Sequence, residues 1–484
     1  MAIATIPPEL LLQCLGHLGE ADLLTASLVC RDWLGPCRDY YWGGRLWLNP
    51  MNKDANSLAA LMGETTTVPR KIQVLVMDET KQFKDGYANQ TASWQAHMLK
   101  IMSHFSTVYY ISIGGLNLNR FPVEIRRHIL PPAQVNGVLE ILSLKVEHPE
   151  EATPFILNQP YAKFLTLGHI ALASETDEDE RGKTIHDGEG NDQERKPADQ
   201  ETKNASSDIS PSTFRTGPVV RLGKLRHLCL NSGPQGITWS HIVPLLASGQ
   251  LVDLQTLIVD CHDGEALGKL FRPIAPALRS LAIQFNCPGE SSQLPLSLLG
   301  RIPEYTANST LPNPGAHMDI SDARSLTKLA FSLANYPEKE YALADTLTTI
   351  SSAPPSVEHV FLNLGKETIN TENHPAQSAV SQWEALDVAL ARLPKLKRIT
   401  IVVVFIHRVF IDRASMIAWE RVGRLTTVDK WQNNALGFAK AQLPACASKG
   451  LLELKHLKRK WAGSPFANYG PNFNVVDLVD SRPR

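Results

Sequence analysis

The hexapeptides LRHLCL (225–230), LQTLIV (254–259) and LRSLAI (278–283) repeat one pattern, with apolar residues at positions 1, 4 and 6. Positions 4 and 6 share a face, because side chains alternate between the two faces of a strand. The spacings of 29 and 24 residues between the three copies leave room for one strand and one returning helix per unit. The pattern therefore predicts buried parallel strands that alternate with helices.

The same pattern recurs along the chain at irregular intervals. Further copies place positions 1, 4 and 6 at Ile72, Leu75 and Met77; Val108, Ile111 and Ile113; Leu139, Leu142 and Leu144; Ala162, Leu165 and Leu167; Leu326, Leu329 and Phe331; Val357, Val360 and Leu362; and Leu396, Ile399 and Ile401. Candidate helices precede several strands, at 57–62, 93–104, 239–247 and 381–393. We predict an α/β fold with a curved parallel sheet and helices outside it. A conventional α/β domain is the alternative.

The N-terminal 48 residues carry a second dense signal, which is helical. The Pro-Pro pair at 7–8 suits a first helical turn, and Leu11, Leu15 and Leu18 then recur at helical spacing. Asp22 suits the N-cap of a second helix. Three short helices are predicted, with more apolar positions than so small a unit can enclose. Part of this leucine surface is therefore expected to be buried against a partner or against the rest of the chain.

These N-terminal residues resemble the F-box. The segments IPPELL (6–11), CL (14–15), DLL (22–24) and VCRDW (29–33) follow the F-box order and spacing, with Ile6 in place of the usual leucine. The resemblance implies docking onto the Skp-family adaptor of a cullin-RING ubiquitin ligase. The residues that would form the docking surface or hold its shape are Pro7, Leu10, Leu11, Leu15, Leu18, Leu23, Leu24, Val29 and Trp33. Packing of this surface within the chain is the alternative.

The rest of the chain resembles irregular leucine-rich repeats, and an F-box followed by such repeats is known especially in fungal F-box proteins. The two resemblances imply a three-helix F-box at 1–48, a repeat-like solenoid at 49–463 and a C-terminal tail or cap at 464–484. An acidic insertion at 174–217 interrupts the solenoid, and its part 174–210 has 12 acidic and 5 basic residues. We interpret it as a disordered, solvated linker, with a phosphorylated control loop as the alternative.

Composition and charge argue against several classes of function. The chain has 48 Lys and Arg against 49 Asp and Glu, so no global positive field favours nucleic-acid binding. The longest strongly apolar stretch, 399–406, is far too short to span a membrane. The 7 cysteines lack metal-binding spacing, so we expect no metal, no cofactor and a reducing compartment, cytoplasmic or nuclear. Two common hydrolase motifs, G-x-S-x-G and H-E-x-x-H, are absent from the sequence, and no enzymatic activity is expected.

Positions 3, 5 and 7 of the repeated pattern point away from the leucine core, onto the opposite face of the sheet. The centre of that face is an apolar row flanked by polar residues, and it consists of Cys229, Ile258, Ala282, Ala330 and Phe361. Such an arrangement is typical of a protein-binding groove. We predict a substrate-binding surface formed by Ile258, Asp260, Gln284, Lys328, Phe361 and Asn363. The alternative is that the C-terminal tail or further helices cover the row.

These features favour the function of a substrate receptor, in which the F-box binds the adaptor and the repeat-like body captures an unidentified protein for ubiquitination. Such a receptor catalyses no reaction and acts by raising the effective concentration of substrate near the conjugating enzyme. A non-degradative scaffold that joins proteins through the same two surfaces is the alternative. An unrecognised enzyme in the body is a third hypothesis.

Overall fold

The structure of the protein is a computed structural model. It describes residues 8–15, 17–18, 20–29, 33, 36–37, 45–48, 74–78, 107–120, 130, 134–172, 220–231, 237–249, 251–261, 263–285, 318–333, 340–365, 377–404 and 425–455. The acidic insertion at 174–217, the tail at 464–484 and the candidate helices at 57–62 and 93–104 lie outside these residues. The predictions made for those four segments are therefore not tested by the structure.

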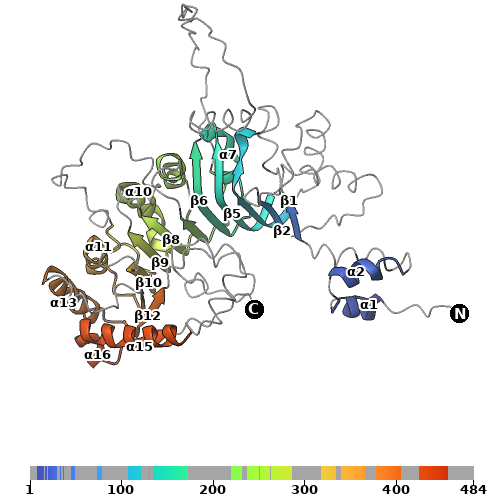
Figure 1. The fold of residues 1–484 in the computed structure, drawn as a ribbon. Helices are drawn as coiled ribbons and strands as arrows, with labels where there is room; N and C mark the ends of the chain where they lie inside the picture. Colours follow the sequence, from blue (N-terminus) through green and yellow to red (C-terminus); the bar gives the residue numbers. More distant parts are fainter. Residues whose placement is uncertain are drawn as a thin grey trace, which may run out of the picture.

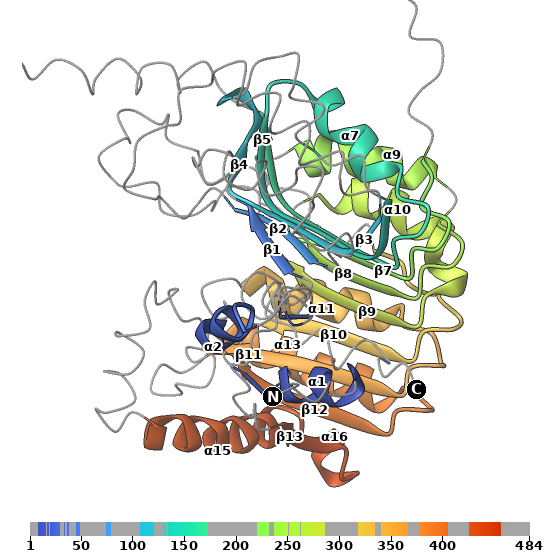
Figure 2. The same ribbon diagram turned by 90° about the vertical axis from the view of Figure 1, so that its right-hand side faces the viewer.

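One large parallel sheet forms the body of the protein. Its strands are β1 (Arg45–Leu48), β2 (Val74–Asp78), β3 (Thr107–Gly114), β4 (Leu116–Asn117), β5 (Gln134–Val146), β6 (Phe164–Leu172), β7 (His227–Leu230), β8 (Thr256–Cys261), β9 (Ser280–Phe285), β10 (Lys328–Leu333), β11 (His359–Gly365), β12 (Arg398–Val404) and β13 (Leu452–Lys455). Apart from β4, which pairs with β5, the strands lie side by side in chain order. The sheet is curved and open, with β1 and β13 at its two edges (Figure 2).

Helices cover one face of this sheet. They are α7 (Pro149–Leu157), α9 (Val243–Ser248), α10 (Gly264–Ile274), α11 (Glu340–Ser351), α13 (Gln377–Ala391), α15 (Leu425–Gln442) and α16 (Pro444–Ser448). Each of them contributes buried apolar side chains to the same main core as the strands. The mixed α/β architecture with a large parallel sheet is thus confirmed, and the candidate helices at 239–247 and 381–393 are found at α9 and α13.

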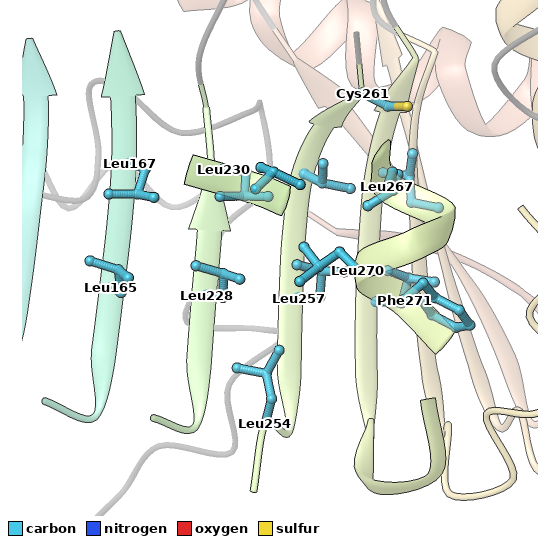
Figure 3. Close-up of a cluster of buried hydrophobic side chains, with 14 of the residues drawn as sticks. Leu165, Leu167, Leu228, Leu230, Leu254, Leu257, Cys261, Leu267, Leu270 and Phe271 are labelled. Atoms are coloured by element: carbon cyan, nitrogen blue, oxygen red, sulfur yellow. The ribbon is translucent and has the colours of Figure 1, made fainter. Parts of the chain in front are cut away.

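Two unbroken rows of apolar residues connect the strands to these helices. Position 4 of the pattern is occupied from β2 to β12 by Leu75, Ile111, Leu139, Leu165, Leu228, Leu257, Leu281, Leu329, Val360 and Ile399. All of them are buried, and position 6 forms an equivalent row one pleat further on. Figure 3 shows the middle of both rows, with Leu267, Leu270 and Phe271 of α10 beside the strands. Close packing of this kind is the main source of the stability of the sheet.

The prediction was out of register in one strand. Leu139 of β5 pairs with Leu165 of β6, so Leu139 holds position 4 and not position 1. Position 6 of β5 is therefore Ile141, and Leu142 is only partly buried. The physical reason is a register shift in the pairing of β3 with β5. β5, a strand of 13 residues, has one extra residue between the partners of Val108 and Tyr110, so its core positions no longer follow the spacing of the pattern.

The boundary between the N-terminal unit and the sheet also differs from the prediction. Residues 45–48 were included in the F-box segment, but they form β1 and pair in parallel with β2. The N-terminal helices α1 (Pro8–Leu15) and α2 (Glu20–Ala26) lie to the side of the sheet (Figure 1). Their buried residues form a cluster of their own, separate from the main core.

Candidate protein-interaction sites

The two N-terminal helices enclose a small apolar interior. Leu11 and Leu15 of α1, four residues apart, face Leu23 and Ala26 of α2, and Cys37 completes the buried cluster. This spacing places the two leucines of α1 on one side of the helix, one turn apart. Trp33, which the structure also places in a helical turn, packs against the cluster from its edge. These residues hold the unit together.

A second set of apolar residues on the same unit is exposed to solvent. Leu10 of α1 is 52% exposed, and Leu18 follows in the turn after this helix, where its N–H donates to the carbonyl of Leu15 at 3.1 Å. Leu28 and Val29 lie in the turn that ends α2 and are 83% and 58% exposed. The N–H groups of this turn donate to carbonyls of α2 at 2.9 to 3.1 Å, so the turn has a defined geometry. Four exposed apolar side chains on so small a unit are typical of a docking surface.

The structure therefore divides the nine predicted adaptor-binding residues. Buried or partly buried members hold the shape of the unit, and they are Leu11, Leu15, Leu23 and Trp33. Exposed members are available for docking, and they are Leu10, Leu18 and Val29. Pro7 and the side chain of Leu24 lie outside the described residues. Leu28, the most exposed of the large apolar residues described, was not included among the predicted docking residues.

The second candidate site is the sheet face opposite the helices. One row, which we call the central row, runs across it from β3 to β13 and consists of Ser112, Glu140, Thr166, Cys229, Ile258, Ala282, Ala330, Phe361, Thr400 and Glu453. Its middle five residues are the predicted apolar row, in adjacent strands and in register. The row is polar at both ends.

The middle of the central row is not an open groove. Ile258 and Phe361 are only 2% and 8% exposed, and the five apolar residues form a buried cluster separate from the main core. Sequence periodicity shows on which face a side chain lies but not what covers that face. The burial of Ile258 and Phe361 agrees with the alternative stated for this row, that other parts of the chain cover it. Because these side chains are buried, their first effect is on the stability of the sheet.

The six predicted substrate-binding residues do share this face. Asp260, Gln284 and Asn363 lie in one register row, and Lys328 lies in the row on the other side of Ile258 and Phe361. Asn363 is buried, whereas the other three polar residues of the set are partly exposed. Their role in binding a substrate stays a prediction.

A buried acid in the central row was missed by the sequence analysis. The carboxylate of Glu140 accepts hydrogen bonds from the hydroxyl of Tyr110 and from that of Ser112, the latter at 3.1 Å. Burial raises the pKa of Glu140, and the two hydrogen bonds oppose this shift only in part. The register error in β5 concealed this residue, because it put Glu140 at position 2 of the pattern and not on the face opposite the helices.

Two ionisable side chains on this face, those of Cys229 and His227, are uncharged at physiological pH. Burial, together with the carboxylates of Glu140 and Asp260, raises the pKa of the Cys229 thiol to about 12, so the thiol stays protonated. His227 stacks on the ring of Phe164 with 4.1 Å between centroids. Burial and the charge of the neighbouring arginine lower the pKa of His227 to about 4, so this imidazole is neutral at physiological pH.

The described residues of the segment 261–263, Cys261 and Asp263, have structural roles. Asp263 is the N-cap of α10 and accepts from the N–H of Ala266 at 2.9 Å. Cys261 is buried in the main core. Within the described ranges, no group of three or more His, Cys, Asp or Glu side chains is placed to hold a metal ion. Nor is any described helix long and apolar enough to cross a membrane.

The N-terminal unit is thus a small helical unit with a packed interior and four described apolar side chains that are exposed to solvent. Residues 3–43 match the F-box-like family, and this match ends two residues before β1 begins. It confirms the F-box resemblance for the N-terminal segment. No curated protein matches the chain.

Proposed function

We propose that the protein is a substrate-receptor subunit of a Skp-cullin-F-box type ubiquitin ligase. The observation that carries the proposal is the F-box-like segment at 3–43. Its described part exposes Leu10, Leu18, Leu28 and Val29, while Leu11, Leu15 and Leu23 are packed inside. An F-box-like module typically binds a Skp-family adaptor, and the adaptor in turn binds a cullin. The exposed leucines are the residues we expect to contact the adaptor.

The body is proposed to be an irregular leucine-rich-repeat-like solenoid that captures a protein substrate. Support comes from the strand order, in which each strand pairs with its neighbours in the chain, and from the two apolar rows that repeat from strand to strand. The receptor needs no catalytic groups, because it acts by holding a substrate near the enzyme that transfers ubiquitin. We expect it to act in the cytoplasm or nucleus, without cofactor or metal.

The proposal is tested by affinity purification of the full-length protein and of a Leu10→Asp, Leu28→Asp variant. The wild-type protein should recover the adaptor and the cullin, and some co-purified protein should become longer-lived when cullin neddylation is inhibited. The variant should lose the adaptor and the cullin, since unpaired charges in a packed apolar interface are costly. Recovery of the cullin by the variant at the wild-type level would contradict the proposal.

A non-degradative scaffold is the alternative function, and it uses the same exposed leucines. It predicts recovery of the adaptor together with bound proteins whose lifetimes do not respond to inhibition of neddylation. The two functions are therefore separated by protein turnover and not by binding.

A further inference from the structure

The parallel sheet brings the amino ends of all its strands to one edge. The backbone ladder extends one residue beyond β6, β7, β8 and β9 on this side, where the N–H of Arg226 donates to the carbonyl of Lys163 at 2.9 Å. Gln255 bonds in the same way to Arg226, and Arg279 to Gln255, each at 2.8 Å. Lys163, Arg226, Gln255 and Arg279 thus form an ordered row just before four neighbouring strands. We call the three cations of this row the basic edge.

The three side chains of the basic edge are exposed, and none forms an ion pair with another described residue. At the other end of the same edge, before β11 and β12, a cation does have a partner: Lys397 forms an ion pair with Glu358 at 2.7 Å. In the basic edge the position between the two arginines is held by an uncharged glutamine. Among the described residues, the three cations therefore have no ion-pair partner of the kind that Glu358 provides for Lys397 at this edge.

Neighbouring groups add to the positive charge at this end of the sheet. Lys224, in the turn before β7, lies 4.8 Å above the ring of Tyr161. Burial and, to a smaller extent, the positive charge of Arg226 lower the pKa of His227. Asp253 is the acidic residue in the turn before β8, and the structure shows no ion pair between it and the basic edge.

The spacing of the basic edge fits an extended peptide that crosses the strand ends. Adjacent strands are separated by about 4.8 Å, so Lys163 and Arg279 are about 14 Å apart along the edge. Alternate side chains of an extended peptide recur about every 6.7 Å, so acidic residues at i, i+2 and i+4 span about 13 Å. Long lysine and arginine side chains accommodate the small difference. A nucleic acid fits less well, because its binding requires more phosphate contacts than three cations provide.

We propose that the basic edge binds an extended acidic peptide. The inference deepens the proposed function and rests on it in one respect, namely that the peptide belongs to the captured substrate. It also explains how the protein can select partners although the middle of the central row is buried: the selective contact would lie at the strand ends and not on the sheet face. Charge complementarity of this kind sets specificity and the rate of encounter.

The test uses the purified full-length protein and a fluorescein-labelled peptide of seven Ser-Glu repeats, with binding followed by fluorescence anisotropy. A Ser-Gln peptide of equal length and a fluorescein-labelled 15-nucleotide oligouridine serve as probes of charge and of ligand class. The edge variant is Lys163→Glu, Arg226→Glu, Arg279→Glu. Its matched control is Lys269→Glu, Arg272→Glu, Lys440→Glu, which makes the same change in net charge at exposed positions of α10 and α15.

The affinities of the wild-type protein and of the control variant for the acidic peptide should agree within about threefold. The edge variant should bind this peptide at least about tenfold more weakly, since three exposed ion pairs are replaced by three repulsive contacts between like charges. Raising the salt concentration should weaken wild-type binding. Equal losses in both variants, no binding to the wild-type protein, or tighter binding of oligouridine would overturn the proposal. Thermal unfolding of both variants at the wild-type temperature shows that folding is intact. Adaptor binding, measured separately, reports on the proposed function, so the two can fail independently.

Discussion

Truncation of Leu28 and of Leu15 to alanine should separate the adaptor-binding surface from the interior of the F-box-like unit. Leu28 is 83% exposed, so Leu28→Ala should change the free energy of unfolding by no more than about 0.5 kcal/mol. If the leucine is fully buried against the adaptor, its removal costs about 1.5–3 kcal/mol of binding. That loss corresponds to an affinity about 10 to 100 times weaker.

Leu15 should behave in the opposite way. It is 1% exposed and is one of the five described residues that form the buried cluster, so Leu15→Ala should destabilise the unit by about 2–5 kcal/mol. Such a loss is comparable with the whole stability of a small domain, and any weaker adaptor binding would then follow from unfolding. Hydrogen exchange of residues 8–29 measures this effect separately from binding.

The assay is calorimetric titration of a purified Skp-family adaptor into each variant, with hydrogen exchange as the measure of folding. Val252→Ala, a change at an exposed apolar residue of the body, is the matched control and should leave both readings unchanged. The reasoning is refuted if Leu28→Ala binds the adaptor within twofold of the wild-type protein. It is equally refuted if Leu15→Ala leaves the exchange of α1 and α2 unaltered.

Three further predictions concern the body. The pKa of Glu140 in the folded protein lies above its ordinary value of 4.5, so its protonated form stabilises the fold below pH 4.5, and this stabilisation is lost as the pH rises through the folded-state pKa. Glu140→Gln should therefore reduce the difference between the urea midpoints measured at pH 5 and at pH 7. An unchanged difference would contradict this prediction. Phe361→Ala should lower the free energy of unfolding by about 3–5 kcal/mol, and a loss below 1 kcal/mol in urea titrations would show that the buried cluster is not tightly packed. The carboxylate of Asp387 in α13 accepts hydrogen bonds from two backbone N–H groups at the start of α16, at 2.6 and 2.9 Å. Asp387→Ala should therefore destabilise the packing of α16 on α13 by about 2–4 kcal/mol and speed hydrogen exchange in α16. Glu384→Ala, at an exposed position of α13, should do neither.

The strands could be predicted because their side chains alternate strictly and their cores are apolar. Positions 4 and 6 of each of the ten copies fall in a strand, from Leu75 in β2 to Ile401 in β12. The exception in register, Leu139, arises from a shift between paired strands, which depends on the neighbouring strand and not on local sequence. Short edge strands such as β1 and β13 escaped detection because four residues carry too little periodicity.

The candidate sites were harder to predict than the fold. Helical spacing grouped Leu11 and Leu15 correctly, but a stripe of leucines does not reveal which members face a second helix of the same unit. Likewise the alternation placed Ile258 and Phe361 on the correct face, while their burial depends on tertiary contacts that periodicity does not report. Exposure is a property of the assembled structure, so only the structure distinguished docking residues from packing residues.

Because the strands lie in the sheet in the same order as in the chain, the position of a strand in the sequence gives its distance along the sheet from β1. There are eleven steps from β1 to β13, and at about 4.8 Å each they span about 50 Å along the curved sheet. β1 begins two residues after the F-box-like segment ends. Along this path β6 lies about 19 Å and β9 about 34 Å from β1. Each added or deleted strand would shift all later strands by one strand spacing, about 4.8 Å, relative to β1. If the body binds a protein as proposed, the strand at which it binds sets the distance of that protein from the F-box-like segment.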